Sequence, residues 1–370
     1  MQVDSDYNSI ERLVHWLALE FRFVRELSFD VERLFFLPPK QHVSSKITKQ
    51  ISNPADGAVY VCGLARSGTT ILLHILDEIK DFRSQTYRDM PFVLAPNLWK
   101  MITQHDNSPA IAEMRAHGDN LMVHFDSPEG FEEVFWRTFS RINLDKQCFG
   151  VEEPTLDALE NFADYRALVA NPTSTRDHHF TYRYLSKNNN NLLRLNTLSR
   201  DPTATLLLVY RDPIATARSL YYQHQRFSIA HSTDDFTRHY MRWLAHHEFG
   251  LDHLPFDFAL PEMDVTLKPD NPNYWLGYWN AVYLHVLAQS ESPFYLVNYD
   301  VLCDEPEQML KSIFARLHVD ADAKFLAQNI RSPSVECKPA DEFNSEWVRR
   351  AQKTHQQLLG SSKNITSRLS

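Results

Sequence analysis

The fold of this chain is decided by residues 59–70, which read VYVCGLARSGTT. The first four residues are apolar, and β-branched or aromatic residues predominate, as in a buried strand. From Thr69 to Ile79, isoleucine and leucine side chains recur on one side of a predicted helix. The stretch therefore predicts a strand, a glycine-containing loop and a helix in direct succession.

Two later segments repeat this alternation. Residues 205–210 form a continuous apolar run, which is typical of a central parallel strand covered on both faces, and Pro213 suits the first turn of a helix over 214–225. A third unit predicts a strand at 294–298 and a helix at 305–317. We therefore predict an α/β fold with a P-loop-like central parallel β-sheet flanked by helices.

We expect a single domain over residues 1–370. It would consist of a helical N-terminal arm in 1–50, an α/β core in 56–320 and a C-terminal segment in 321–370. Within the arm, residues 8–37 carry apolar side chains at spacings of three and four, which predicts one or two amphipathic helices. Three interpretations of these helices stay open, namely packing on the core, a homodimer contact and a peripheral membrane contact.

Composition excludes several classes of protein. The net charge of −9 argues against a nucleic-acid-binding protein with a wholly basic face. The four cysteines lack CxxC spacing, so neither a zinc site nor a disulfide scaffold is indicated. The histidine-rich stretch 246–253 lacks HExxH spacing and predicts no metal site. With no signal-like start and no apolar run of about 18 residues, we predict a cytoplasmic protein without a transmembrane segment.

The loop of residues 63–70 has the character of an anion-binding site. Free backbone N–H groups and the positive end of the helix dipole bind phosphate oxygens at such a strand-to-helix turn. Gly63 and Gly68 match the spacing of the nucleotide-binding pattern GxxxxGK[ST], but Thr69 stands where that pattern has lysine. Arg66 is the loop's cation. The loop therefore predicts phosphate binding by a design that differs from that of the NTPases.

A second motif follows the predicted strand at 205–210. It consists of Arg211, Asp212 and Pro213, with Ser219 eight residues after the arginine. An arginine fork and a hydroxyl at the carboxyl end of a strand can hold a second phosphate. In the alternative interpretation, Asp212 is a helix N-cap and Arg211 is its surface partner.

Together, in this order, the two motifs resemble the sulfotransferase superfamily, which uses 3′-phosphoadenosine 5′-phosphosulfate (PAPS). The resemblance covers roughly residues 56–320, and the arginine in the loop is more similar to the bacterial, glycan and tyrosyl-protein branches. It implies PAPS as donor, adenosine 3′,5′-bisphosphate (PAP) as product, and no metal. By this resemblance, the residues that bind the 5′-phosphosulfate are Gly63, Arg66, Ser67, Gly68, Thr69 and Thr70, and those that bind the 3′-phosphate are Arg211 and Ser219.

Three weaker similarities extend the assignment. Lys187 stands where the family often has a Lys–Ser/Thr–Pro element, although the Ser/Thr and Pro are absent here and a solvated loop lysine is the plain alternative. Tyr299 lies in a segment similar to one that approaches the nucleotide, and it reads equally well as a buried tyrosine at a strand end. Lys338 belongs to a stretch, beginning at Ser334, that faintly resembles a segment closing over the nucleotide.

The resemblance implies in-line transfer, in which the protein mainly positions the reactants and neutralises charge. Arg66 and Lys187 would stabilise charge on the departing phosphate. An acceptor hydroxyl also needs a general base, and Asp89 is the first candidate because the family places such a group after the first helix. Asp89 could instead pair with Arg88 or cap a helix.

Five further residues are candidates for the base. Glu132 and Glu133 come second, because two carboxylates in one cleft raise the pKa of one of them, whereas on an exposed helix they would only be solvated. The remaining candidates are Glu152, Glu153 and His124.

The acceptor is expected to be a small molecule or a glycan. Aromatic residues such as Trp275 and Tyr278 could stack on it, but their spacing favours a core stripe of a helix. Two alternatives to the enzyme remain open, namely a non-catalytic sulfotransferase-like scaffold protein and a P-loop small-molecule kinase.

Overall fold

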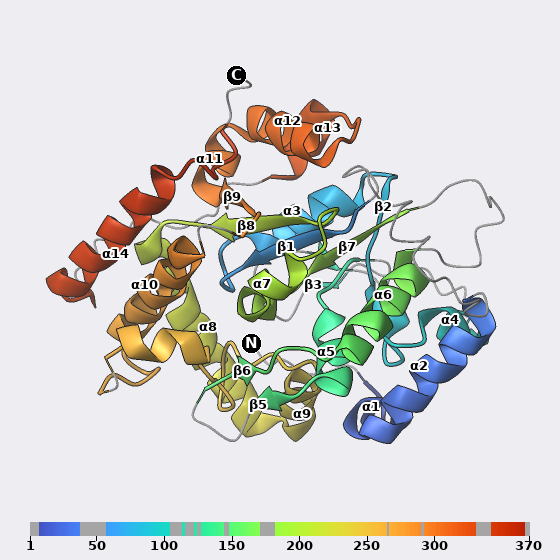
Figure 1. Ribbon diagram of the computed structural model, residues 1–370. Coiled ribbons are helices and arrows are strands. Elements are labelled where there is room, and N and C mark those ends of the chain that lie inside the picture. Colours follow the sequence, from blue (N-terminus) through green and yellow to red (C-terminus); the bar gives the residue numbers. More distant parts are fainter. Residues whose placement is uncertain are drawn as a thin grey trace.

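Figure 1 shows the computed structural model of the chain. The structure describes residues 7–37, 57–103, 113–114, 122–123, 127–143, 148–170, 182–264, 266–289, 292–330 and 342–366.

A five-stranded sheet lies at the centre of the molecule (Figure 1). Its strands, in spatial order, are β2 (Phe82–Arg83), β7 (Arg183–Lys187), β1 (Val59–Gly63), β8 (Thr205–Tyr210) and β9 (Tyr295–Asn298). All neighbouring strands are parallel. The predicted α/β fold with a central parallel sheet is therefore confirmed.

Strands β1 and β8 are buried along their whole length because helices cover both faces of the sheet. Side chains on a strand alternate between faces. Val61 and Leu207 pack on one face with α3 (Thr69–Asp77), α11 (Tyr299–Asp304), α12 (Pro306–Leu317) and α13 (Ala323–Leu326). Tyr60 and Leu208 pack on the other face with α5 (Glu132–Phe139), α6 (Leu156–Ala170), α8 (Pro213–Thr233) and α10 (Pro272–Ala288), as Figure 1 shows.

The remaining elements surround this core. The other helices are α1 (Ser9–Glu20), α2 (Arg22–Phe36), α4 (Pro96–Thr103), α7 (Leu195–Leu198), α9 (Asp235–Trp243) and α14 (Ser345–Leu359). Short 3₁₀ helices are η3 (Tyr87–Asp89), η4 (Asn189–Leu193), η5 (Asp257–Glu262) and η6 (Ala327–Asn329). Two small antiparallel ladders pair β3 (Glu113–Met114) with β4 (Met122–Val123) and β5 (Ile142–Asn143) with β6 (Gly150–Val151).

The N-terminal arm forms two helices, α1 and α2, that pack on the core. Phe29 of α2 is fully buried, and the buried carboxylate of Glu32 accepts hydrogen bonds from the backbone N–H groups at the start of α4. The opposite side of the arm keeps large apolar side chains exposed, among them Phe23 and Leu34. A homodimer contact through this arm stays a prediction.

Helices α8, α9 and α10 lie in the second half of the chain. The aromatic residues of α10 are buried, as the core-stripe interpretation requires. Beyond its predicted end at Gln225, α8 continues to Thr233 and α9 follows, so the irregular chain in this region begins at Leu244. Within the described ranges, no helix is long and apolar enough to cross a membrane. A cytoplasmic location stays a prediction.

Candidate active site

The loop of residues 63–70 connects β1 to α3 at the carboxyl edge of the sheet. Gly63 and Gly68 have φ angles of +149° and +101°. Residues other than glycine rarely adopt such positive φ angles. A Cβ at Gly68 would also lie 2.1 Å from the ring of Tyr299. Both conformation and close approach therefore require glycine at position 68.

The polar side chains of this loop have distinct surroundings. Ser67 and Thr69 are buried, whereas Arg66 and Thr70 are partly exposed. The Nε of Arg66 donates a hydrogen bond of 3.0 Å to the hydroxyl oxygen of Ser219 on α8. Two motifs that lie about 150 residues apart in the sequence thus meet at one point in space.

Arg211 follows β8, the neighbour of β1, and so emerges at the same edge. Its side chain is buried, with Nε 3.6 Å from Oδ1 of Asp300 and the guanidinium carbon 5.6 Å from the centre of the Tyr299 ring. Asp212 caps α8 by accepting a 2.8 Å hydrogen bond from the N–H of Ala215. The predicted cap is therefore present, but Arg211 is not a surface residue.

Tyr299 is the first residue of α11 and is buried between the two motifs. It contacts Gly68 on one side and the Arg211 guanidinium on the other. Burial raises the pKa of its hydroxyl, so Tyr299 is neutral at physiological pH.

Lys187 is the last residue of β7, which is the other neighbour of β1. Its side chain is buried, and Nζ lies 4.0 Å from a carboxylate oxygen of Glu129. A Cβ at Gly130 would be 2.4 Å from the Lys187 carbonyl oxygen, so the segment at 129–131 lies directly against the strand end. Three cationic side chains, those of Arg66, Lys187 and Arg211, therefore lie at or just after the carboxyl ends of three adjacent strands. Lys187 is therefore not the solvated loop lysine of the alternative interpretation.

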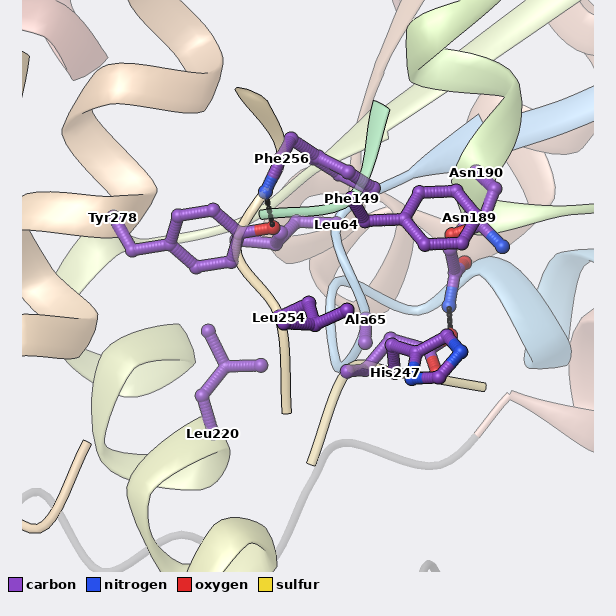
Figure 2. Close-up of a pocket in the computed structure, with 11 residues that line it drawn as sticks. Leu64, Ala65, Phe149, Asn189, Asn190, Leu220, His247, Leu254, Phe256 and Tyr278 are labelled. Atoms are coloured by element: carbon purple, nitrogen blue, oxygen red, sulfur yellow. Dashed lines mark hydrogen bonds between the residues drawn. The ribbon is translucent and has the colours of Figure 1, made fainter. Parts of the chain in front are cut away.

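A narrow pocket adjoins this edge of the sheet (Figure 2). The empty space inside it is about 330 Å³, part of which is open solvent. It lies between the 63–70 loop, α8 and the irregular residues after α9. Its lining residues are Leu64, Ala65, Phe149, Asn189, Asn190, Leu220, His247, Glu248, Leu254, Phe256 and Tyr278.

Comparison with known proteins decides the family. The sequence model of a family described as "Sulfotransferase family" matches residues 58–259, more than half of the chain. The chain belongs to the sulfotransferase family. The predicted family and the predicted enzyme class are confirmed by this match. No curated protein sequence matches the chain.

Several solved structures are similar to this sulfotransferase. Sulfotransferase STF9 from Mycobacterium avium is 13% identical, with 96% of this chain and 87% of that chain covered and a TM-score of 0.47. Sulfotransferase STF1 from Mycobacterium tuberculosis is 12% identical, with 95% and 88% covered and a TM-score of 0.45. Mouse sulfotransferase SULT7A1, solved in complex with PAP, is 9% identical, with 83% and 85% covered and a TM-score of 0.37.

The first candidate for the base, Asp89, ends the 3₁₀ helix η3. Its Oδ2 accepts a 2.8 Å hydrogen bond from the N–H of Thr86, in a capping box that the sequence analysis kept open as an alternative. The neighbouring Tyr87 donates to Glu129, whose carboxylate also approaches Lys187. Asp89 therefore belongs to a segment close to the site, and its role as a base stays a prediction.

The second candidates, Glu132 and Glu133, are buried on α5 within a polar network. Arg194 donates to both oxygens of Glu133 at 2.7 and 2.8 Å, and both side chains are 1% exposed. Glu132 accepts from Trp136 and Tyr184. Neither carboxylate lines the pocket. Both carboxylates are thus held by buried partners, and the role of Glu133 as a base stays a prediction.

The other candidates lie elsewhere. Glu152 and Glu153 are largely exposed and pair with Arg141 and Arg200. His124, Ser334 and Lys338 fall outside the described residues, so their predicted roles stay predictions.

Glu248 is the pocket residue that the sequence analysis missed. The histidine-rich stretch around it carries no recognisable motif and does not match a metal-binding pattern. Burial opposes ionisation of Glu248, but the charges of His246 and Lys187 and a hydrogen bond from Asn189 outweigh it, so the pKa is lowered from 4.5. The run from Asn188 to Asn191 is buried, with Asn188 as the N-cap of η4 and the other three asparagines at its start. Its amides supply the polar side of the pocket.

Proposed function

We propose that this sulfotransferase uses PAPS as donor and moves its sulfuryl group in line to a hydroxyl of a small-molecule or carbohydrate acceptor, releasing PAP. The observation that carries the proposal is the 3.0 Å hydrogen bond from Arg66 to Ser219, which joins two predicted phosphate-binding motifs at one edge of the sheet. Open α/β sheets bind their ligands at this edge.

In this proposal the 63–70 loop holds the 5′-phosphosulfate. The backbone N–H groups at the start of α3 point toward an anion there, and the helix dipole favours its charge. The residues assigned to this group are Gly63, Arg66, Ser67, Gly68, Thr69 and Thr70. The positive φ angles at Gly63 and Gly68 support the assignment, since they let the chain curve around a bound anion.

Arg211 and Ser219 hold the 3′-phosphate in this proposal, and Tyr299 packs beside it. A buried guanidinium whose ionic partner is 3.6 Å away has donors to offer a phosphate. Within the described residues, the Ser219 hydroxyl oxygen accepts a hydrogen bond from Arg66. Its proton can therefore be donated to the 3′-phosphate at the same time.

PAPS supplies the sulfuryl group and a phosphate leaving group. Arg66 and Lys187 stabilise the negative charge that grows on the oxygens of the departing phosphate, which is the largest electrostatic demand of the step. Lys187 is suited to this because it is buried at the end of β7, where water screens its charge only weakly. The prediction that no metal takes part stays a prediction.

Isothermal titration of the purified protein with PAP, without metal and beside ATP–Mg²⁺, tests the proposal. We expect PAP to bind selectively and Arg211→Ala to weaken it about 10- to 100-fold, because a charged hydrogen bond is worth about 1.5–3 kcal/mol. Arg141→Ala is the matched control, since the side chain of Arg141 is largely exposed and pairs with Glu152; the affinity of this variant for PAP should equal that of the wild type.

The alternatives give different results in the same titration. Binding of ATP–Mg²⁺ alone would support a small-molecule kinase. Binding of neither nucleotide would support a scaffold protein, and the proposal would then be wrong.

A further inference from the structure

We propose that the outer face of the N-terminal arm is the interface of a homodimer, in which α1 and α2 pack against α1 and α2 of a second copy of this chain. The arm lies outside the residues that would hold the donor, so the proposed function is not needed for this inference. Of the interpretations that the sequence leaves open, packing on the core describes the inner face of the arm, and a homodimer contact describes its outer face.

The outer face consists of large apolar side chains that are exposed. They are Ile10, Leu13, Trp16 and Leu17 of α1, Phe21 at the junction of the two helices, and Phe23, Leu27, Leu34 and Phe35 of α2. Within the described residues, 17 large apolar side chains are exposed; these nine lie between residues 10 and 35, and the other eight are spread over residues 101–359. Single exposed apolar residues are normal, whereas a concentration of them marks an interaction surface.

On α1, the exposed row and the buried residues lie on opposite sides of the helix. Ile10, Leu13 and Leu17 recur at spacings of three and four, which places them in one row. The buried residues of α1 are His15, Ala18 and Leu19. With 3.6 residues per turn, this buried set lies about half a turn from the row. The row therefore points away from the core on which α1 packs.

Helix α2 has the same two-sided arrangement. Phe23, Leu27 and Leu34 form its exposed row. The buried residues of α2, on the opposite side, are Arg25, Phe29 and Glu32. The rings of Trp16 and Phe21 contact each other near the junction of the helices, with centres 4.8 Å apart, so apolar contact continues from one helix to the next. Figure 1 shows α1 and α2 at the edge of the molecule.

The inner face holds the arm in place, so the arm cannot turn over to bury its outer face. The carboxylate of Glu32 is fully buried and accepts 2.9 Å hydrogen bonds from the N–H groups of Asn97 and Leu98 at the start of α4. Arg25 donates to the hydroxyl of Thr138 on α5 at 2.9 Å. Rotation of the arm would break these bonds and leave buried charges without partners. The outer face is thus presented rigidly to whatever lies outside the described chain.

The area of the outer face matches one side of a dimer interface. Its nine side chains are between 41% and 79% exposed. A large aromatic side chain has about 150–250 Å² to bury and a leucine somewhat less, so the exposed parts together offer roughly 800–1,000 Å². The largest apolar patch on a typical monomer is about 300–600 Å². One partner in a standard protein–protein interface buries about 800 Å².

The charges of the arm favour a protein partner over a lipid surface. Helices that lie on membranes are rich in lysine and arginine, which attract anionic headgroups. Residues 7–37 contain no lysine, and their four arginines are outnumbered by five acidic residues. Arg12, Arg22 and Arg33 pair with carboxylates at 3.5, 2.8 and 3.0 Å, respectively. The arm therefore offers no excess of positive charge to a membrane.

A second copy of the chain fits because the exposed row of α2 is complementary to itself. Phe23 and Leu34 stand at its two ends, about 16 Å apart along the helix, and Leu27 lies near its middle. In an antiparallel pair related by a two-fold axis, each Phe23 meets the partner's Leu34, and both copies of Leu27 lie close to the axis. Asp30, at the edge of the row, keeps its pairing with Arg33 at 3.7 Å. Two-fold dimers are the commonest oligomers of soluble proteins.

Sedimentation equilibrium of the full chain, at concentrations from about 1 to 100 µM, tests the interface. We expect the mass of two chains at the upper end of this range. Because the contact is apolar, its dissociation constant should change by less than about threefold between roughly 0.1 and 1 M NaCl. In a flotation assay with vesicles of phosphatidylcholine and phosphatidylserine, the wild-type protein should stay with the soluble fraction.

Substitutions in the row locate the interface. Phe23→Glu and Leu27→Glu should each raise the dissociation constant at least about 100-fold, since each places two carboxylates in a desolvated contact. Phe325→Glu is the matched control, because Phe325 is 61% exposed on α13, which packs on the opposite face of the sheet from the arm. Its dissociation constant should equal that of the wild type. Far-UV circular dichroism should be the same for all these proteins, because the changed side chains are exposed.

Cross-linking tests the two-fold arrangement with a milder substitution. Leu27→Cys should give a covalent dimer with a short bis-maleimide, because the two cysteines would lie close to the axis. Phe325→Cys and the wild type should not give one. This variant also keeps the proposal testable if a glutamate variant fails to fold.

Four outcomes would overturn the proposal or part of it. A wild-type chain that stays monomeric at about 100 µM would overturn it, whether the protein floats with the vesicles, which would make the outer face a membrane contact, or remains in solution. A dimer that survives both Phe23→Glu and Leu27→Glu would place the interface elsewhere. Equal dissociation by Phe325→Glu would show that added charge alone separates the subunits. A dimer that depends on the row but is not cross-linked through Leu27→Cys would overturn the antiparallel two-fold arrangement.

Discussion

The substitution Gly68→Ala is expected to destabilise the protein by about 2–5 kcal/mol, for two separable reasons. The φ angle of +101° costs a residue with a Cβ about 1–2 kcal/mol. The new methyl group would also lie 2.1 Å from a ring carbon of Tyr299, and relief of such overpacking costs about 1–3 kcal/mol. The same displacement moves the loop that is proposed to hold the 5′-phosphosulfate, so the affinity for PAP should fall as well.

Urea unfolding of four proteins measures the two contributions separately. These are the wild type, Gly68→Ala, Tyr299→Ala and the double variant, which together form a double-mutant cycle. In the Tyr299→Ala background the ring is gone, and Gly68→Ala should cost only the conformational part, about 1–2 kcal/mol. Gly360→Ala is the control, because Gly360 has a φ angle of −80° and the nearest atom to its added Cβ is 3.4 Å away.

Two results would refute this reasoning. A cost for Gly68→Ala no larger than that of Gly360→Ala would show that the loop tolerates a side chain there. An equal cost with and without the Tyr299 ring would show that the contact between the loop and α11 does not matter.

Three further predictions concern groups outside this contact. Glu133→Gln leaves the buried guanidinium of Arg194 without its charge partner and should cost about 3–5 kcal/mol in urea unfolding; a cost below about 1 kcal/mol would contradict the structural role of this pair. Burial lowers the pKa of His253 from 6.5 to about 3, so its contribution to stability is present above pH 6.5 and is lost as the pH falls toward 3. Wild-type protein should therefore lose about 2 kcal/mol more unfolding free energy between pH 8 and pH 5 than His253→Gln loses. An equal loss in the two proteins would refute the assignment. Asp89→Asn should lower sulfuryl transfer by about 100-fold or more, because the amide can still accept from Thr86 but cannot take the proton of the acceptor hydroxyl; activity within about threefold of wild type would contradict the role of Asp89 as the base.

Local sequence predicted the central strands well. The strand at 205–210 has the predicted bounds, because a continuous apolar run is compatible only with burial on both faces. The helix after it was predicted to end at Gln225 but continues to Thr233, since the intervening polar residues do not break a helix and Asp234 caps the next one. Helix ends depend on such weak signals and are harder to predict than strand cores.

The asparagine run shows where local patterns are insufficient. Four consecutive asparagines are typical of a turn in water, and yet Asn191 is fully buried. Its amide donates to the carboxylate of Glu132, which comes from a helix about 60 residues earlier in the chain. Polar residues can be buried when distant partners satisfy their hydrogen bonds, and a local pattern carries no information about those partners.

For the site too, local sequence predicted some features and long-range packing decided the others. The 63–70 loop, the cap at Asp212 and the position of Arg211 could be read from the sequence alone, because each depends on backbone conformation and on residues only a few positions apart. The contact of Arg66 with Ser219 and the placement of Glu248 beside Asn189 were decided by the tertiary structure. Packing of the parallel strands and of the chain after α9 brings together residues about 60 to 150 positions apart, and short sequence motifs do not encode those contacts.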